Sequence, residues 1–370
     1  MKLLLFIHSL GGGGAERVMA ALANQWAVEG RAVVLVTLAS RSGDRYALDP
    51  AIRRLELGLA SESSGVVSAL AGNARRVRAL RRVLRAERPD VAVAMLTTCN
   101  VLLALAGARL RVRLVGSERV HPPQVPLGGM WARLRAWCYG GLDTVVVQTR
   151  ETAEWVRTHT RARRLAVVPN PVTWPLPSTE PVRAPGSVGT PGRRRLLAVG
   201  RLEGQKRFGL LIALFARLAP RFPEWELVIV GDGPDRAVLE RQVAEAGLIG
   251  RIMLPGHVGN MADWYACADL FVLSSKFEGF PNVLAEAMAH GLPVVSSDCD
   301  TGPRDIVRHE VDGLLVPTDD EEALAAALAR LMGDADARSR FAMRAVEVRE
   351  RFAMSRIAAQ WDDVLSGRTP

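Results

Sequence analysis

The side chains best suited to chemistry lie just after the apolar run 270–274. This run predicts a buried strand that leads into a turn at Glu278-Gly279. Pro281 suits the first position of a following helix, and Gly291 suits the residue that ends it. The first helical turn leaves backbone N–H groups without partners and carries the positive end of the helix dipole. An anion site is therefore predicted at Phe280, Pro281, Asn282 and Val283.

Two glutamates flank this predicted anion site. Glu278 lies just before it and Glu286 lies one to two turns inside the helix. A carboxylate can accept paired hydrogen bonds from neighbouring hydroxyls, so two carboxylates beside a diphosphate suit a nucleotide sugar. An ordinary buried helix with a glutamate at each end explains the same residues equally well.

Two further segments add cations and a tight turn. A strand predicted at 195–200 places Arg201 at its end and Lys206 at the start of the next helix, where both can neutralise a diphosphate. The strand predicted at 226–230 ends at Gly231, whose missing side chain lets backbone approach a ligand closely.

The elements that position these residues alternate along the whole chain. Short apolar runs followed by helical patterns are typical of parallel sheets with crossover helices, so the predicted class is α/β. The predicted strands are 2–8, 32–39, 91–96, 111–116, 144–149 and 165–169, then 195–200, 226–230, 251–254, 270–274, 293–297 and 313–316.

A chain of 370 residues is expected to form about two domains. The proline-rich stretch near the middle predicts a linker between the domains. Ligands of such sheets bind at the carboxyl ends of the strands, so the ligand is expected in a central cleft that both domains face. The tail has helical spacing and is expected to pack back across the junction. The predicted divisions are 1–170, the linker 171–194, 195–351 and the C-terminal helix 352–370.

Composition excludes several classes of protein. Hydrophobic residues make up 49% and charged residues 24%, which is typical of globular domains. No apolar stretch reaches the roughly 20 residues of a membrane span, which predicts a cytoplasmic protein. The net charge of +9 favours anionic partners, and no recognition motif points to nucleic acid. Histidines and cysteines show no metal-ligand spacing.

The ordered motifs resemble one known family. The chain is similar to the retaining glycosyltransferases of family 4, which have the GT-B architecture of two Rossmann-like domains. The resemblance covers nearly the whole chain, and its combination of motifs is specific although each alone is weak. It rests on Gly200-Arg201-Leu202 with Lys206, Gly231-Asp232-Gly233, Glu278 with Glu286, Gly13-Gly14-Ala15-Glu16-Arg17 and Val168-Pro169-Asn170-Pro171.

The resemblance implies roles for individual residues. Arg201 and Lys206 would stabilise the leaving nucleoside diphosphate, Glu278 would contact the transferred sugar, and Glu286 would hold the ribose. Gly13 and Gly14 resemble a loop that passes close to the phosphates, and Asn170 matches a position that lines the cleft. Such enzymes need neither metal nor cofactor, and their co-substrate is a nucleotide sugar, here expected to carry UDP rather than GDP.

One departure from the family pattern concerns a histidine near the donor sugar. Arg119 stands at the matching position, with His121 two residues later. Arg119 can bind sugar hydroxyls or an acceptor phosphate, or it can form a surface ion pair with Glu118. A D-x-D sequence at Asp298-Cys299-Asp300 is interpreted as a chance match to a metal motif, because the flanking motifs fit the metal-independent architecture.

A stripe of arginines predicts an anionic partner. In the helical pattern 66–88, Val66 and Leu80 belong to an apolar stripe, while a second stripe comprises Arg75, Arg78, Arg82 and Arg85. This second stripe is either a solvated face or a contact with anionic lipid or the diphosphate of a lipid-linked acceptor. Apolar residues at Met130, Trp131, Leu134 and Trp137 can add anchoring or pack in the core.

The overall pattern also resembles bacterial enzymes that extend lipid-linked oligosaccharides or polysaccharide repeat units. The expected protein is therefore a peripheral enzyme on the inner face of the cell membrane, transferring a hexose or N-acetylhexosamine to a lipid-linked or oligosaccharide acceptor. A sugar-nucleotide epimerase of the same architecture and a catalytically degenerate membrane-associated scaffold are the alternatives. The sequence does not indicate an oligomeric state.

Overall fold

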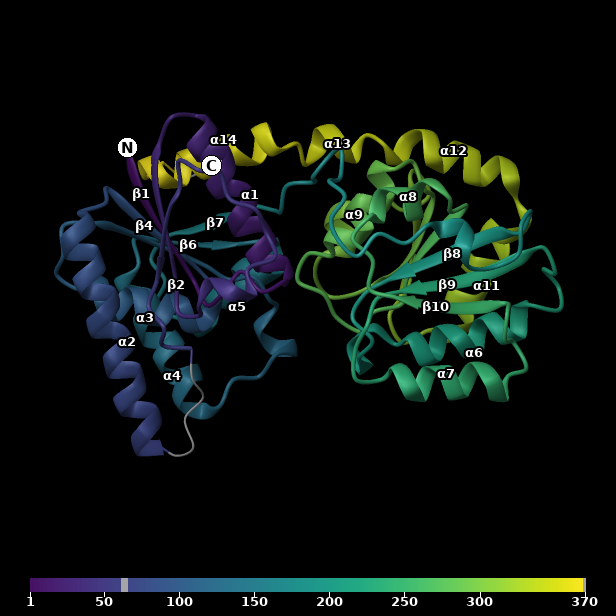
Figure 1. The fold of residues 1–370 in the computed structure, drawn as a ribbon, viewed down its shortest axis with the longest axis horizontal. Helices are drawn as coiled ribbons and strands as arrows, with labels where there is room; N and C mark the ends of the chain where they lie inside the picture. The colour runs from purple at the N-terminus through teal and green to yellow at the C-terminus, as the bar shows by residue number, and fades with distance from the viewer. Residues whose placement is uncertain (61–65, 369–370) are drawn as a thin grey trace. The chain divides into compact units, whose positions relative to one another are not determined.

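The chain forms two compact units. The computed structural model describes residues 1–60 and 66–368 (Figure 1). The first unit comprises Met1–Pro171 with Met354–Pro370, and the second comprises Val172–Ala353. The final helix therefore belongs to the first unit, and the predicted linker 171–194 belongs almost entirely to the second.

The first unit is built on a seven-stranded parallel sheet in the order β3-β2-β1-β4-β5-β6-β7. Its strands are β1 (Lys2–Ile7), β2 (Ala32–Thr37), β3 (Arg53–Glu56), β4 (Val91–Met95), β5 (Arg113–Ser117), β6 (Thr144–Val147) and β7 (Leu165–Val167). Six strands match the prediction, and the edge strand β3 was not predicted, because its sequence Arg-Arg-Leu-Glu contains one apolar residue.

Helices cover both faces of this sheet. They are α1 (Gly14–Val28), α2 (Val66–Glu87), α3 (Thr97–Gly107), α4 (Gly129–Cys138), α5 (Arg150–His159) and α14 (Met354–Ser366). Leu80 and Leu84 of α2 share one core with residues of α3, α4, α5 and the strands. On α1, Trp26 packs edge-to-face against the buried Trp361 of α14, which fastens the end of the chain to this unit.

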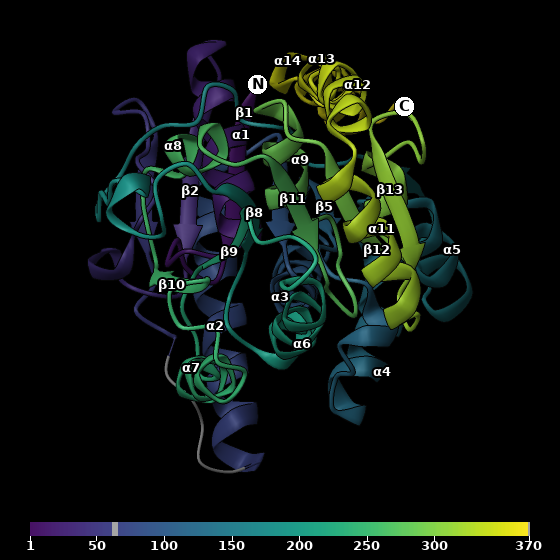
Figure 2. The same cartoon turned by 90° about the vertical axis from the view of Figure 1, so that its right-hand side faces the viewer.

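The second unit is built on a six-stranded parallel sheet in the order β10-β9-β8-β11-β12-β13 (Figure 2). Its strands are β8 (Arg194–Val199), β9 (Trp225–Val230), β10 (Ile252–Gly256), β11 (Leu270–Leu273), β12 (Val294–Asp298) and β13 (Gly313–Pro317). All six match the predicted strands, so two Rossmann-like parallel sheets confirm the predicted fold class.

The helices of the second unit surround this sheet. They are α6 (Phe208–Leu218), α7 (Arg236–Glu245), α8 (Met261–Ala266), α9 (Asn282–Ala289), α10 (Pro303–Ile306), α11 (Glu321–Gly333), α12 (Ala335–Ala345) and α13 (Val348–Arg351). Apolar residues of α6, α7, α11 and α12 form one continuous core with the strands.

The proline-rich segment is held against the second unit by specific hydrogen bonds. Arg183 N–H donates to Asn260 Oδ1 at 3.0 Å, and Thr190 N–H donates to Glu226 Oε2 at 2.9 Å. Glu226 also receives Arg195 Nε and Nη2 at 3.1 and 2.9 Å, and its side chain is fully buried. This segment is therefore structured by the second unit, although its composition predicted a free linker.

The order of strands marks where each sheet can hold a ligand. In the second unit the chain builds outward from β8 in one direction and from β11 in the other, and these two strands are neighbours. Loops at the carboxyl ends of β8 and β11 therefore diverge, which leaves room for a ligand between them. Lys206 and Glu278 follow these two strands.

Replacing Glu226 tests how the proline-rich segment is held. Glu226→Ala should lower the free energy of unfolding by about 3–5 kcal/mol, because it leaves the buried Arg195 guanidinium without its partner. Urea unfolding of the full chain measures this change. The control is Glu322→Ala, which removes an exposed ion pair with Arg217 and should leave the urea midpoint nearly unchanged. Equal midpoints for the two variants would contradict this account.

Candidate functional site

A buried ion pair joins two of the predicted catalytic residues. Lys206 Nζ donates to Glu278 Oε1 at 2.6 Å, and only 13% and 9% of the two side chains are exposed. Ser275 Oγ donates to the same carboxylate oxygen at 2.6 Å. The structure thus brings together a cation and a carboxylate that are separated by 72 positions in the sequence.

Backbone contacts fix the two loops that carry this pair. The Ser274 hydroxyl donates to the Lys206 carbonyl at 2.7 Å, and Gln205 Nε2 donates to the Phe277 carbonyl at 2.8 Å. Gly200 makes room for the lysine, because a Cβ there would lie 2.9 Å from Lys206 Cε. The ammonium group is consequently placed by packing and hydrogen bonds rather than by its own side-chain preferences.

The loop before α9 adopts a conformation that requires a neighbouring glycine. Gly302 has a φ of +94°, and a Cβ there would lie 2.7 Å from Pro281 Cδ and 2.9 Å from the Gly279 carbonyl. Helix α9 begins at Asn282, with Pro281 as the preceding cap residue. The prediction that Pro281 takes the first helical position is wrong by one residue, because its backbone remains extended with ψ 92°.

Helix α9 begins at Asn282, shortly after Glu278 of the ion pair. Phe280 and Pro281 are buried, whereas Asn282 and Val283 are partly exposed. Phe280 packs edge-to-face on Phe352, which anchors the first turn. Because the first turn of any helix has unsatisfied N–H groups, these residues present a positive partial charge next to Lys206 and Glu278.

Glu286 lies on the buried side of α9. Its side chain is 3% exposed, and the Tyr265 hydroxyl donates to Glu286 Oε2 at 3.2 Å. Tyr265 comes from α8 and was not predicted from the sequence, because nothing local links it to Glu286. Tyr265 lies 21 positions earlier in the sequence, on another helix, where no motif identifies it as a partner.

Arg201 and Gly231, which were also predicted to lie near a ligand, have different surroundings from the Lys206–Glu278 pair. Arg201 is 70% exposed and forms an ion pair with Glu203 at 3.3 Å, so its guanidinium faces solvent. Gly231 has a φ of +142°, and a Cβ there would meet the Gly200 carbonyl oxygen at 1.9 Å. The close approach that requires glycine at 231 is therefore made by the protein's own backbone.

In the first unit, Gly13 and Gly14 form the junction between β1 and α1. Gly13 caps α1, which begins at Gly14, and Tyr46 Oη donates to the Gly13 carbonyl at 3.1 Å. The preceding Gly12 has a φ of +120°, which favours glycine. The predicted loop is thus a glycine turn at the carboxyl end of a central strand.

Arg119 and Asn170 contact each other at the same edge of the first sheet. Arg119 Nη1 donates to Asn170 Oδ1 at 2.7 Å, and Gln148 Nε2 donates to the same oxygen at 2.8 Å. Arg119 is only 7% exposed, so the alternative of a surface ion pair with Glu118 is wrong. The Glu118 carboxylate instead receives Thr97 Oγ1 and the Tyr139 hydroxyl in the core.

His121 is turned toward a helix. Its Nδ1 lies 3.2 Å from Thr152 Oγ1 on α5, and the side chain is 9% exposed. In this structure the imidazole therefore contacts α5, and its expected role toward an acceptor stays a prediction.

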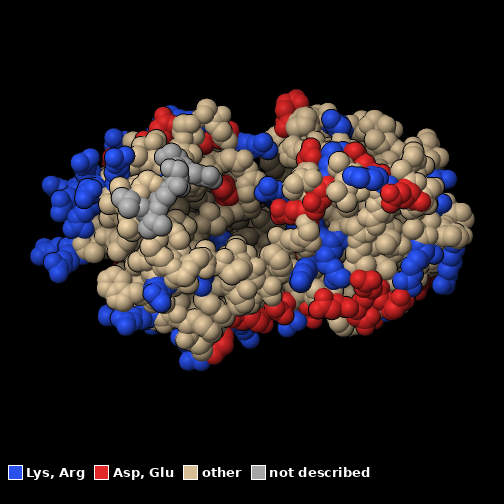
Figure 3. All heavy atoms as spheres, turned by 90° about the horizontal axis from the view of Figure 1, so that it is seen from below, with Lys and Arg blue, Asp and Glu red and all other residues tan. Residues whose placement is uncertain are grey.

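The four arginines of the predicted stripe are all exposed on α2. The neighbouring Arg76 and Arg81 instead bind the backbone carbonyls of Leu59 and Ala106. Within residues 1–60 and 66–368, Arg75, Arg78, Arg82 and Arg85 form no ion pair, and the structure does not describe the Val66 side chain. Basic side chains gather at one end of the first unit in Figure 3.

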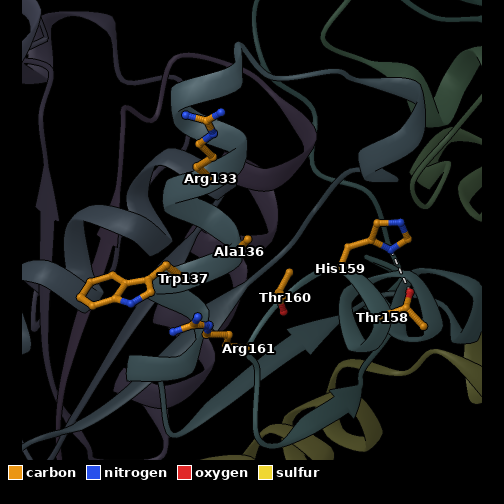
Figure 4. A pocket seen from close by; sticks show the side chains of 7 residues that line it. All are labelled: Arg133, Ala136, Trp137, Thr158, His159, Thr160 and Arg161. Atoms are coloured by element: carbon orange, nitrogen blue, oxygen red, sulfur yellow. Dashed lines mark hydrogen bonds between the residues drawn. The ribbon is translucent and has the colours of Figure 1, made fainter.

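A hollow of about 400 Å³ lies beside α4 and contains none of the predicted site residues. Trp137 and Arg161 lie near each other in it, with Arg133 farther along the same helix (Figure 4). Trp137 is 60% exposed, and Met130 is also exposed, whereas Trp131 and Leu134 pack partly against the core. Only two of the four predicted anchoring residues therefore reach solvent substantially.

The D-x-D sequence has a protein partner. Asp298 Oδ1 accepts from Arg304 Nε at 3.0 Å. Across the described part of the chain, no three His, Cys, Asp or Glu side chains are grouped so as to hold a metal ion. No helix in that same part has the length and hydropathy needed to cross a membrane.

Comparisons with known proteins agree over nearly the whole chain. The family described as "Glycosyltransferase Family 4" matches residues 12–173, and "Glycosyl transferases group 1" matches residues 193–334. An exopolysaccharide phosphotransferase of Streptomyces coelicolor is 33% identical over 78% of this chain, which spans 29% of that relative's length.

Two further proteins match from end to end. A Campylobacter jejuni N-acetyl-D-galactosaminyltransferase, named for an undecaprenol-diphosphate-linked acceptor, is 27% identical over 98% of this chain and 97% of its own. The structure of Anabaena HepE with UDP and glucose has a TM-score of 0.76 and 20% identity, covering 98% of this chain and 99% of its own. The two family matches, on the two parallel sheets that carry the predicted motifs, show that this chain belongs to the family 4 glycosyltransferases, a retaining, metal-independent family with the GT-B fold.

Proposed function

We propose that this enzyme transfers a hexose or N-acetylhexosamine from a UDP-sugar to a glycan acceptor linked to a lipid diphosphate, in the assembly of a cell-surface glycan. The observation that carries the proposal is the buried Lys206–Glu278 pair, which precedes the N-terminus of α9 at the point where the second sheet reverses its strand order. UDP is supported by the HepE complex, and a diphosphate-linked acceptor is supported by the name of the Campylobacter relative.

In this proposal the second unit supplies the charge that a metal ion supplies in other transferases. Lys206 and the N–H groups of α9 stabilise the negative charge that develops on the leaving diphosphate. The exposed Arg201 side chain reaches the diphosphate by leaving its partner Glu203. Glu278 then exchanges its contact with Lys206 for hydroxyls of the transferred sugar, while Glu286 binds the ribose. Asn170, Gly13 and Gly14 contribute from the first unit.

The acceptor side of the proposal rests on charge and exposed apolar groups. Arg75, Arg78, Arg82 and Arg85 recur at intervals of three and four residues, so they lie on one face of α2 over about 15 Å. Each arginine near an anionic surface contributes about 1 kcal/mol. Trp137 and Met130 add exposed apolar surface on α4, and α3 contacts both α2 and α4. The favoured surface is therefore the cytoplasmic leaflet with its lipid-linked acceptor.

Lys206 offers a sharp test because the chain contains only three lysines. Lys206→Ala should lower turnover of a UDP-sugar about 100- to 1,000-fold, because it removes a charge that acts on the leaving group. The melting temperature should also fall, because Glu278 loses its buried cationic partner, so turnover is measured below the melting temperature of the variant. Arg201→Ala should also lower turnover by orders of magnitude. The assay is UDP release, including slow donor hydrolysis without acceptor.

The matched control is Lys276→Ala, which removes an exposed lysine from the same loop region and should leave turnover unchanged. Near-normal turnover of both Lys206→Ala and Arg201→Ala would place the diphosphate elsewhere. A wild-type protein that releases no UDP from any donor would favour the catalytically degenerate scaffold.

Metal independence is tested by binding. UDP should raise the melting temperature equally with and without EDTA, since stabilisation follows from binding to the folded state alone. Glu286→Gln should weaken UDP binding about 10- to 100-fold, because a carboxylate that binds ribose hydroxyls acts in the ground state. Thermal denaturation with and without EDTA measures the first outcome, and isothermal titration of UDP measures the second. Loss of UDP binding in EDTA, restored by manganese, would refute metal independence.

The arginine stripe is tested with vesicles. Changing Arg75, Arg78, Arg82 and Arg85 to Gln should abolish sedimentation with anionic vesicles and leave UDP binding unchanged, because the stripe lies in the first unit. Wild-type binding should weaken steeply between low and physiological salt. The control changes four exposed arginines of the second unit, Arg217, Arg221, Arg241 and Arg340, to Gln and thus removes the same charge. Equal loss in both variants would mean that only net charge matters.

A further inference from the structure

The Arg119 guanidinium is buried without a counter-ion. A guanidinium has five N–H donors, and among the described residues this side chain donates from Nη1 to Asn170 Oδ1. Nε and Nη2 are both buried and have no hydrogen-bond partner in the part of the chain that the structure describes. Burial lowers the pKa of Arg119 to about 9, so the group stays charged at neutral pH.

The neighbouring residues cannot neutralise this charge. Glu118 is adjacent in sequence, but its two carboxylate oxygens are bound by Thr97 and Tyr139, and burial raises the pKa of Glu118. Asn170 Oδ1 already accepts two hydrogen bonds. The Trp361 ring lies 5.7 Å from Arg119 Cζ, and such a cation–π contact offsets only part of the cost of burying a charge.

The position of Arg119 in the sheet favours a ligand over a purely structural role. Arg119, Gln148 and Asn170 follow β5, β6 and β7, three neighbouring strands. Open α/β sheets bind their ligands outside the carboxyl ends of the strands. Two unsatisfied charged donors at this edge are the complement of an anion, because arginine binds carboxylates and phosphates through two parallel N–H groups.

We propose that Arg119 is a specificity-determining residue that binds an oxyanion of a substrate, either a carboxylate on the transferred sugar or a phosphate of the acceptor. The inference rests on the proposed function for the identity of the two substrates. Because Nε and Nη2 are enclosed in this structure, the oxyanion reaches them by displacing a neighbouring side chain, such as the amide that Arg119 now contacts. Binding then exchanges a hydrogen bond to a neutral acceptor for an ion pair with hydrogen bonds.

The experiment compares wild type with Arg119→Gln in two binding arms. One arm measures the affinities of UDP-glucuronic acid and UDP-glucose, which differ by a carboxylate on the sugar. The other arm measures inorganic pyrophosphate in the presence of saturating UDP. A lost charge-assisted contact should weaken the relevant ligand about 10- to 100-fold in the variant. UDP alone should bind both proteins equally.

The control is Arg135→Gln, which removes another buried arginine of the first unit, one that stacks on Trp155. It should leave both arms unchanged. A preference for the glucuronate that Arg119→Gln removes identifies the sugar carboxylate, and a pyrophosphate affinity that it removes identifies the acceptor phosphate.

Unchanged affinities in both arms, together with a lower melting temperature for Arg119→Gln, would overturn the proposal and assign Arg119 a structural role. Should wild type fail to bind UDP, the proposed function fails instead. Pyrophosphate binding without UDP then still decides the role of Arg119.

Discussion

The ion pair between Lys206 and Glu278 organises the second unit's site. Removing two charges from water costs several kcal/mol per ion, and the interior returns this only when the geometry and supporting hydrogen bonds are good. Here the support comes from Ser275 on the carboxylate and from backbone contacts on both loops. Because the pair spans the loops after β8 and β11, it also ties these two loops together at the point where the strand order reverses.

Much of the fold follows from local sequence. Twelve strands are predicted because each is a short apolar run buried between helical patterns, and the glycine-rich loop after β1 marks where the first helix begins. The missing strand, β3, pairs with β2 at the sheet edge, where Arg53 and Glu56 are exposed and Arg54 is buried against Asp44. Alternation of apolar residues carries no signal for such a strand.

The site was predictable as motifs but not as contacts. Glu278 and Lys206 were singled out separately, and only the fold places their charged atoms 2.6 Å apart. Ser275, Tyr265 and Gln148 were not predicted, since each acts through a partner that lies in another loop or helix. For Arg119, one alternative was a surface ion pair with Glu118. The structure instead buries Arg119, because Trp361 of α14 packs against its guanidinium.

The arginine-rich composition hides different uses of positive charge. Arg195 is neutralised by Glu226 and holds the proline-rich segment, whereas Arg76 and Arg81 bind backbone carbonyls. These arginines contribute to the net charge of +9, but their guanidinium groups are already bound to a carboxylate or to backbone carbonyls of the protein. The exposed stripe of α2 is one of the groups of arginines that reach solvent, and its interest comes from its spacing rather than from the total charge.

In the proposed function, Lys206 and Arg119 are two cations that meet an anionic substrate in different ways. Lys206 has a carboxylate partner in this structure, so in the proposed function a diphosphate reaches it by an exchange of partners. Arg119 hydrogen-bonds to a neutral amide and has no counter-ion among the described residues, so under the proposal an oxyanion gains an ion pair without displacing one. The first arrangement favours a charge that grows during the reaction, because exchange is most favourable when the negative charge is largest. The second favours discrimination between charged and neutral ligands, because a neutral group leaves the buried guanidinium unpaired.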